Sequence, residues 1–294
     1  MGHVDARHPA SPSGVILPLA AAASAMACFQ IGAALAKGLF PLVGPLGAAT
    51  LRLGLGAGML LVMARPWRRW PTSAPVAGLI GLGLSMAGAI VFFYLAIKRL
   101  PLGVAIPLQF MGPLAVAVAG SRRASDLLWV ALAAAGVWAL VGAGSASAHI
   151  DLLGVGYALG AAVGWAGYIL CGKAAGRVFG RSTAALATGV AALLVLPFGA
   201  AGAGQALLSP AVLPLALLVA LVSTALPFTL ELYALSRLPA RTFATFTSLE
   251  PAFAGLSGLV LLGERLSVAQ WFGVALVMTA AGGAAWSSGR PPPA

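Results

Sequence analysis

The sequence predicts an all-α polytopic membrane protein with ten transmembrane helices, arranged as two inverted repeats of five helices each. Three observations lead to this fold class. The composition is strongly apolar, the apolar residues gather into ten runs long enough to cross a bilayer, and a segment of the first half of the chain recurs in the second half.

The composition indicates that lipid covers much of the molecule. Of the 294 residues, 61% are hydrophobic and only 8% are charged, whereas a soluble domain needs a charged surface. The net charge of +11 comes from Lys and Arg scattered in ones, twos and threes between apolar runs, so we expect no nucleic-acid partner. Cys28 and Cys171 both fall inside apolar runs, which predicts neither a disulfide nor redox chemistry.

The ten apolar runs are each about 17 to 26 residues long, enough for a helix to cross a hydrocarbon core of about 30 Å. They cover residues 15–36, 46–64, 75–97, 102–120, 127–143, 152–172, 183–199, 211–236, 242–262 and 268–286. Short connections separate the runs and contain helix-breaking pairs. These pairs are Arg65-Pro66 after the second run, Leu100-Pro101 after the third, Ser209-Pro210 before the eighth and Leu238-Pro239 after it.

The first run, Val15 to Ala36, has an alternative interpretation as a cleaved signal peptide. It follows a polar leader and contains Ala23-Ser24-Ala25, a small-residue pattern that also suits a signal peptidase. We favour a retained helix because the run is long enough to span the bilayer and has a counterpart in the second half. The expected units are a leader (1–14), a first repeat (15–143), a second repeat (152–286) and a tail (287–294).

The positive charges predict that both termini face the cytoplasm from an inner (plasma) membrane. With the N-terminus inside, twelve of the 17 Lys and Arg residues fall on the cytoplasmic side and four on the other, while Arg52 lies within the second run. The cytoplasmic set comprises Arg7, Arg65, Arg68, Arg69, Arg122, Arg123, Lys173, Arg177, Arg181, Arg237, Arg241 and Arg290, and the outer set comprises Lys37, Lys98, Arg99 and Arg265.

The internal repeat relates the two halves of the chain. Residues 94–101 match residues 232–239 at an offset of 138 positions, and both segments end in Arg-Leu-Pro. Further pairs are Gly112-Pro113 with Glu250-Pro251 and Asp126 with Glu264 at the same offset, and Phe29 with Trp165 and Lys37 with Lys173 at an offset of 136. An odd number of spans per repeat turns the second half upside down, an arrangement typical of transporters that open a central site to each side in turn.

Small residues at helical spacing predict close packing between helices. Gly54 and Gly58 lie four residues apart in the second run, and Gly156, Gly160 and Gly164 follow the same spacing in the sixth. Glycines at this spacing let two helix backbones approach each other closely.

Several motifs together resemble one known family. The second half carries Ser223-Thr-Ala-Leu-Pro-Phe, Arg237-Leu-Pro-Ala-Arg-Thr-Phe243, Leu249-Glu-Pro-Ala-Phe-Ala254 and Leu262-Gly-Glu264, and the first half carries Leu51-Arg-Leu, Pro101-Leu-Gly-Val-Ala and Gly112-Pro-Leu-Ala-Val-Ala117. This set resembles the drug/metabolite transporter superfamily with its EamA-type repeat. Residues 34–44 are similar to the threonine/homoserine exporters within that superfamily.

The resemblance covers nearly the whole chain and implies a ten-helix EamA/DMT-like fold around a central cavity. It also implies export of a small polar metabolite, in particular a small amino acid, with protons as the coupling ion. Export of another metabolite or a drug is the alternative. The exporters carry Glu at the position of Gln109, so the chain departs from their pattern there.

Two ionisable side chains inside the apolar runs are the first candidates for a functional site, because a charge at the bilayer centre costs about 2.5–3.5 kcal/mol or more. Glu250 lies in the ninth run directly before Pro251, whose ring loosens the helix. We predict that Glu250 carries a proton or binds a substrate ammonium. The alternative is a structural ion pair with Arg52, which is itself suited to hold a carboxylate or to extend to the outer interface.

Other side chains rank below these two. Glu231 lies near the cytoplasmic end of the eighth run, where a carboxylate can reach the headgroups. Polar and aromatic side chains inside the runs can offer hydrogen bonds or an aromatic wall to a solute, with plain packing as the alternative. They are Gln30, Gln109, Tyr94, Trp165, Tyr168, Thr224 and Tyr233.

Motifs of catalysis do not occur in the sequence. It contains no His-Glu-x-x-His, no Gly-x-Ser-x-Gly and no P-loop, and His3, His8 and His149 fall in the leader or in a loop. We therefore expect a secondary transporter without metal or cofactor, not an enzyme and not an ATP-driven pump. An intramembrane enzyme, a channel and a non-transporting membrane subunit are the alternatives from other classes.

Overall fold

The computed structural model describes residues 12–68, 76–119, 125–142 and 151–288, and every secondary-structure element in these ranges is helical. Several sequence predictions lie outside the described residues. They concern the leader before Pro12, the end of the tail after Ser288, the three histidines His3, His8 and His149, and the cations Arg7, Arg69, Arg122, Arg123 and Arg290.

The helices follow one another along the chain in two sets. The first half forms α1 (Pro12–Lys37), α2 (Phe40–Ala64), the short turn η1 (Pro66–Arg68), α3 (Val76–Ile97), α4 (Leu102–Gln109), α5 (Met111–Ala119) and α6 (Ser125–Gly142). The second half forms α7 (Leu152–Phe179), η2 (Gly180–Ser182), α8 (Thr183–Ala203), η3 (Gly204–Leu208), α9 (Leu213–Ala220), η4 (Leu221–Ala225), α10 (Leu226–Leu235), α11 (Ala240–Thr247), α12 (Glu250–Leu262) and α13 (Val268–Ser288).

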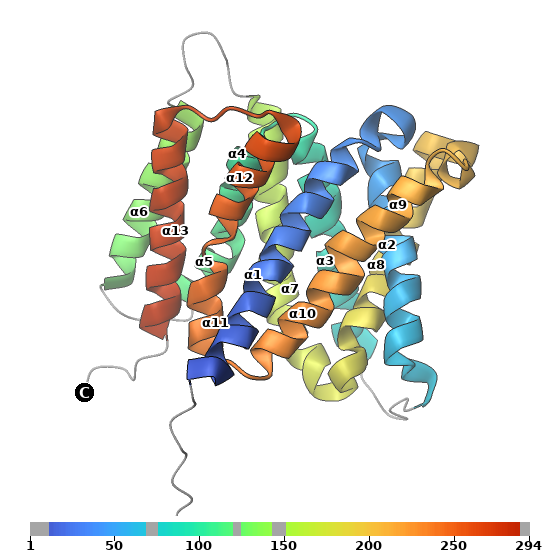
Figure 1. Cartoon of the computed structure of the whole chain (residues 1–294), viewed down its shortest axis with the longest axis horizontal. Helices are drawn as coiled ribbons and strands as arrows, with labels where there is room; N and C mark the ends of the chain where they lie inside the picture. The colour runs from blue at the N-terminus through green and yellow to red at the C-terminus, as the bar shows by residue number, and fades with distance from the viewer. Residues whose placement is uncertain (1–11, 69–75, 120–124, 143–150, 289–294) are drawn as a thin grey trace, which may run out of the picture.

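The described residues contain nine helical segments long and apolar enough to cross a membrane, and a shorter apolar helix at Leu127–Gly142 within α6. The protein is therefore a multi-pass membrane protein. In Figure 1, α1 begins and α13 ends at the same end of the bundle, the lower end in this view. The nine segments are one fewer than the ten predicted spans, and α6 is the shorter apolar helix at the place of the fifth predicted span.

Two of the predicted continuous spans are interrupted. The span at 102–120 breaks at Phe110 between α4 and α5, and the span at 242–262 breaks at Ser248–Leu249 between α11 and α12. Pro113 follows the first break and Pro251 follows the second. A proline favours a helix break at such a place, because it lacks the N–H group and its ring crowds the carbonyl four residues earlier. Both breaks therefore fall at matching positions of the sequence repeat.

The span at 211–236 changes character without stopping. It consists of α9 and α10 joined by η4, a π-helical turn. α2 also differs from its predicted range, since it begins at Phe40 and is kinked at Gly44, which has a φ of 68° and precedes Pro45. Glycine adopts such a positive φ at little cost, and proline favours the kink.

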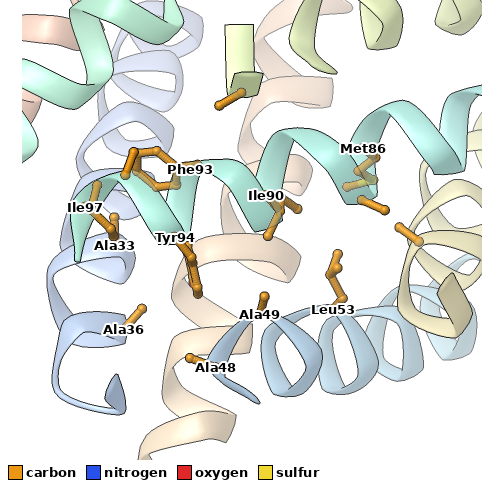
Figure 2. Close-up of a cluster of buried hydrophobic side chains, with 14 of the residues drawn as sticks. Ala33, Ala36, Ala48, Ala49, Leu53, Met86, Ile90, Phe93, Tyr94 and Ile97 are labelled. Atoms are coloured by element: carbon orange, nitrogen blue, oxygen red, sulfur yellow. The ribbon is translucent and has the colours of Figure 1, made fainter. Parts of the chain in front are cut away.

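The two halves interlock through matched helix pairs. α3 packs along α7. In the sequence repeat α10 corresponds to α3 and α1 corresponds to α7, and α10 likewise packs along α1. The other pairs are α2 with α8, α4 with α12 and α6 with α13. One buried cluster takes members from helices of both halves, and Ala33 of α1, Leu53 of α2 and Tyr94 of α3 belong to the part of it that Figure 2 shows. This packing joins helices of the two halves in one core.

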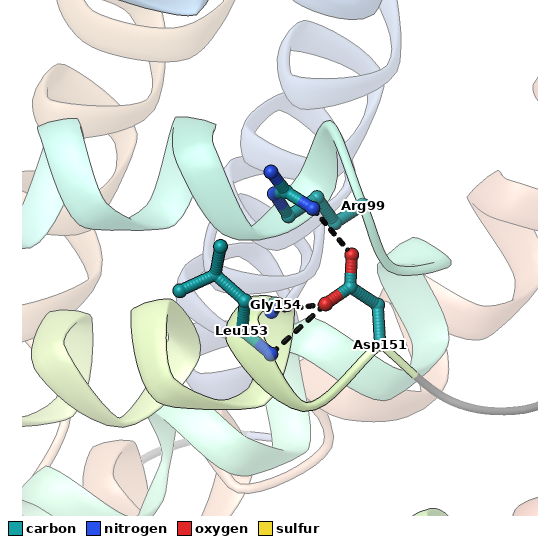
Figure 3. A network of polar contacts seen from close by, with 4 residues as sticks. All are labelled: Arg99, Asp151, Leu153 and Gly154. Carbon is teal, nitrogen blue, oxygen red and sulfur yellow. Dashed lines mark hydrogen bonds and ion pairs between the residues drawn. The ribbon is translucent and has the colours of Figure 1, made fainter.

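An ion pair joins the end of α3 to the start of α7 (Figure 3). Arg99 Nη1 lies 2.6 Å from Asp151 Oδ2. Asp151 Oδ1 accepts hydrogen bonds from the backbone N–H groups of Leu153 and Gly154, so Asp151 caps α7. The hydrogen bond from Arg99, with the two cap bonds, holds the pKa of Asp151 below its ordinary value. The capped α7 then runs along α3 for most of its length.

Only some of the glycines predicted to mediate close packing do so. At Gly164 a Cβ atom would lie 2.5 Å from the backbone nitrogen of Ala89 on α3, and at Gly160 it would lie 3.1 Å from the Phe92 ring. Gly54, Gly58 and Gly156 have open space at that position. The prediction is therefore wrong for these three glycines in the single chain, and it is correct for the part of α7 that faces α3.

The contact at Gly164 gives a first prediction. Gly164→Ala should lower the stability of the purified protein by about 1–3 kcal/mol, because the added methyl group meets backbone atoms that cannot move aside. The midpoint of thermal unfolding in detergent measures this effect. Gly156→Ala is the matched control on the same helix, and it should cause no loss because its methyl group enters open space. Equal midpoints for the two variants would contradict the packing of α3 against α7.

Candidate functional site

The π-helical turn η4 presents a backbone carbonyl to Arg52. In a regular α-helix the carbonyl of Ser223 would accept a bond from residue 227, but that residue is Pro227 and has no N–H. Arg52 Nη2 on α2 lies 2.9 Å from the Ser223 carbonyl oxygen, and Arg52 Nε lies 3.4 Å from Thr224 Oγ1. The guanidinium therefore satisfies a carbonyl that the proline leaves free inside the bundle.

Two glycines let η4 approach its neighbours. A Cβ atom at Gly32 of α1 would overlap the Ser223 side chain, and one at Gly56 of α2 would lie 2.8 Å from Thr224 Cγ2. The turn is consequently held between α1 and α2. π-helical turns of this kind are frequent at functional sites.

Tyr94 on α3 lies on another side of Arg52. The Arg52 guanidinium carbon is 5.7 Å from the centre of the Tyr94 ring, a cation–π contact. Tyr94 is fully buried, and its hydroxyl has no hydrogen-bond partner. Arg52, which is 8% exposed, does not extend to the outer interface as the alternative from the sequence suggested.

A second polar group gathers around Glu250, the first residue of α12. The break between α11 and α12 places this carboxylate at the start of a helix in the interior of the chain's ninth span. Gln30 Nε2 on α1 donates a hydrogen bond of 2.8 Å to Glu250 Oε1. Gln30 is only 1% exposed, whereas Glu250 is half-buried and retains some accessible surface.

Glu231 on α10 faces the same region. It is half-buried and close enough to both Glu250 and Tyr168 to interact with them electrostatically. Tyr168 packs edge-on against Trp165, with 5.2 Å between the ring centres, so α7 contributes an aromatic pair beside the carboxylates. α1, α7, α10 and α12 thus contribute to one cluster, which we call the carboxylate cluster: Gln30, Trp165, Tyr168, Glu231 and Glu250.

The charges of these two groups are not paired with each other. Both ion pairs between described residues, Arg99–Asp151 and Lys37–Glu264, lie away from Arg52, Glu231 and Glu250. The structure therefore does not form the Arg52–Glu250 ion pair suggested by the sequence, because η4 already supplies the partners of Arg52. A buried cation and two half-buried carboxylates are left for other partners.

The remaining predicted residues fall in different places. Gln109 ends α4 beside the break at Phe110, is 6% exposed, and has a carboxamide oxygen without a partner. Tyr233 lies under the guanidinium of Arg237, 3.9 Å from it, and this contact is separate from the carboxylate cluster. In the part of the chain that the structure describes, no group of three or more His, Cys, Asp or Glu residues is arranged to hold a metal.

Sequence reasoning missed three residues that form polar contacts between helices, namely Ser223, Lys37 and Glu264. The Ser223 carbonyl binds Arg52, and Pro227 four positions later was the signal for it. Lys37 Nζ lies 2.6 Å from Glu264 Oε1, and Glu264 Oε2 accepts a 2.7 Å bond from the backbone N–H of Leu102. Both residues of that ion pair had counterparts in the repeat, Lys173 and Asp126, which could have identified them.

Comparison with known proteins gives consistent results. A family profile described as "EamA-like transporter family" matches residues 152–285. The threonine/homoserine exporter RhtA of Salmonella typhimurium (strain SL1344) is 45% identical over 278 residues, which cover 95% of this chain and 94% of that protein. The same exporter of Escherichia coli (strain K12) is 46% identical over 92% of this chain and 91% of its own length.

Two more distant similarities extend the comparison. The uncharacterized transporter YwfM of Bacillus subtilis (strain 168) is 34% identical over 53% of this chain and 54% of its own length. One solved crystal structure, at 18% identity, superposes with a TM-score of 0.57 over 95% of this chain and 99% of that chain. At that identity the superposition shows a shared fold.

Arg52 gives the prediction of this subsection. Arg52→Met should destabilise the protein by about 1–3 kcal/mol, because it leaves the Ser223 carbonyl buried without a donor. Arg52→Lys should lose less stability than Arg52→Met, since an ammonium can still reach one of the two acceptors. Thermal unfolding in detergent checks both variants. Arg68→Met, which removes an exposed arginine, is the control, and an equal effect of the two methionine variants would exclude the proposed role of the Ser223 bond.

Proposed function

Because this chain belongs to the EamA-like transporter family, and is a membrane transporter and not an enzyme, we propose that it exports small amino acids of the threonine and homoserine kind. The observation that carries this proposal is the 45% identity to an exporter of these amino acids over nearly the full length of both chains. Such coverage includes both repeats and every residue of the carboxylate cluster.

The charges in the bundle support a zwitterionic substrate. An amino acid brings one carboxylate and one ammonium, and the interior holds one guanidinium and two carboxylates without ionic partners among the described residues. Arg is the side chain best suited to hold a carboxylate by two parallel hydrogen bonds. The unpartnered Tyr94 hydroxyl supplies a polar group that suits a substrate hydroxyl.

The inverted repeat supports transport by alternating access. The matched helix pairs, α3 with α7 and α10 with α1, are related by exchange of the two halves, as are the breaks at Phe110 and Ser248. Two halves of similar energy can exchange conformations and so open one central site to each side in turn. With both termini in the cytoplasm of an inner membrane, as the positive charges favour, the end that carries the Lys37–Glu264 contact faces outward.

Protons are the coupling ion in this proposal, and Glu250 is their carrier. A carboxylate inside a bilayer is costly when charged and unpaired, so it needs either a proton or a substrate ammonium at each stage of the cycle. Export of the amino acid with the ammonium at Glu250, followed by return with a proton there, exchanges the two. Inward movement of protons then drives outward movement of substrate.

Cells provide the test of this function. Cells that express the chain should survive higher external threonine or homoserine than control cells, and Glu250→Gln should abolish the benefit because a neutral amide carries neither proton nor ammonium. In proteoliposomes, an imposed pH gradient should drive uptake of radiolabelled threonine by the wild type only. The magnitude expected for Glu250→Gln is a loss of at least about tenfold, as for removal of a charge-assisted contact.

Asp151→Asn is the control for this experiment, because it neutralises a carboxylate at the start of α7 and outside the carboxylate cluster. It should keep gradient-driven uptake. Full uptake by Glu250→Gln would show that the proton carrier lies elsewhere. Absence of movement for threonine, homoserine and a wider panel of small metabolites, with folded protein, would refute the transport of amino acids.

A further inference from the structure

Gln30 has a feature that its bond to Glu250 does not explain. Its side-chain nitrogen donates to Glu250 Oε1 over 2.8 Å, but its side-chain oxygen has no partner although the residue is 1% exposed. A buried acceptor without a donor costs about 1–3 kcal/mol. The carboxamide that donates to Glu250 therefore also carries an unsatisfied oxygen.

The groups around Glu250 include further acceptors. Glu250 has a second carboxylate oxygen, and Glu231 of α10 lies close enough to Glu250 to interact with it electrostatically. The region thus combines several acceptors from three helices, α1, α10 and α12, and neither described ion pair supplies a cation to it. A ligand that matches this arrangement carries a positive charge and several N–H donors.

We propose that Gln30, Glu231 and Glu250 form the subsite that receives the ammonium group of the transported amino acid. The three N–H bonds of the ammonium go to Gln30 Oε1 and to the two carboxylates. The aromatic pair Trp165 and Tyr168 lies beside Glu231 and adds a π surface that favours a cation. This assignment rests on the proposed function and specifies which part of the substrate each element holds.

The subsite makes Gln30 a specificity residue. An ammonium bound by two carboxylates alone would also be replaced by a metal cation or by water, whereas a carboxamide oxygen adds a directed acceptor. A site built around such acceptors rejects analogues that lack the donor, because its buried polar groups are then left unpaired. The transporter should therefore require the amine of its substrate.

Competition in proteoliposomes tests the subsite. With radiolabelled threonine in counterflow, threoninol and threonine methyl ester, which keep the amine, should compete. 2,3-Dihydroxybutyrate, which has a hydroxyl in place of the amine, should compete about 100-fold more weakly. Gln30→Met should raise the half-saturating threonine concentration about tenfold and reduce this discrimination by a similar factor.

Gln109→Met is the matched control, since it removes an equally buried carboxamide oxygen that does not contact Glu250. It should leave the discrimination between amine and hydroxyl analogues as in the wild type. Equal competition by both analogue classes in the wild type, or unchanged discrimination in Gln30→Met, would overturn the subsite alone. Absence of threonine and homoserine counterflow in the wild type would overturn the proposed function and the subsite with it.

Discussion

The need to satisfy backbone hydrogen bonds inside a bilayer determines how this protein is built. An uninterrupted helix meets that need by itself, and most of the bundle consists of such helices. The helices around the candidate site differ from such an uninterrupted helix at Pro113, Pro227 and Pro251, because each proline removes one backbone donor. At Pro227 the freed carbonyl of Ser223 is bonded by Arg52. The interruption of a helix thereby fixes a buried charge at the same point.

The position of Glu250 depends on the same constraint. The break before Pro251 makes Glu250 the first residue of a new helix. The Glu250 side chain therefore lies at a helix start within the span, and not in the middle of a regular helix. Gln30 then meets it from α1. Both the Arg52 contact and Glu250 therefore lie where a proline follows in the chain, and the Lys37–Glu264 ion pair lies beyond the far end of α12.

The sequence predicted the large features because each depends on local composition. The helical multi-pass architecture and the buried candidates follow from the apolar runs, and the repeat follows from the match of residues 94–101 with 232–239. The helix breaks were indicated by Pro251 but not placed by hydropathy, which averages over a whole span. The partner of Arg52 could not be read from the charges, since a backbone carbonyl carries no signal in a list of side chains.

The two halves of the sequence repeat are alike at their ends and differ at their centre. The contact residues at the ends are preserved between the halves, as Lys37 with Lys173 and Glu264 with Asp126. The interior is not, because Glu250 matches Gly112 and therefore has no carboxylate counterpart. Exchange between two states requires ends of similar energy, whereas binding requires one site with one orientation. A duplicated chain meets both requirements only if the two halves stay alike at the ends and differ at the centre.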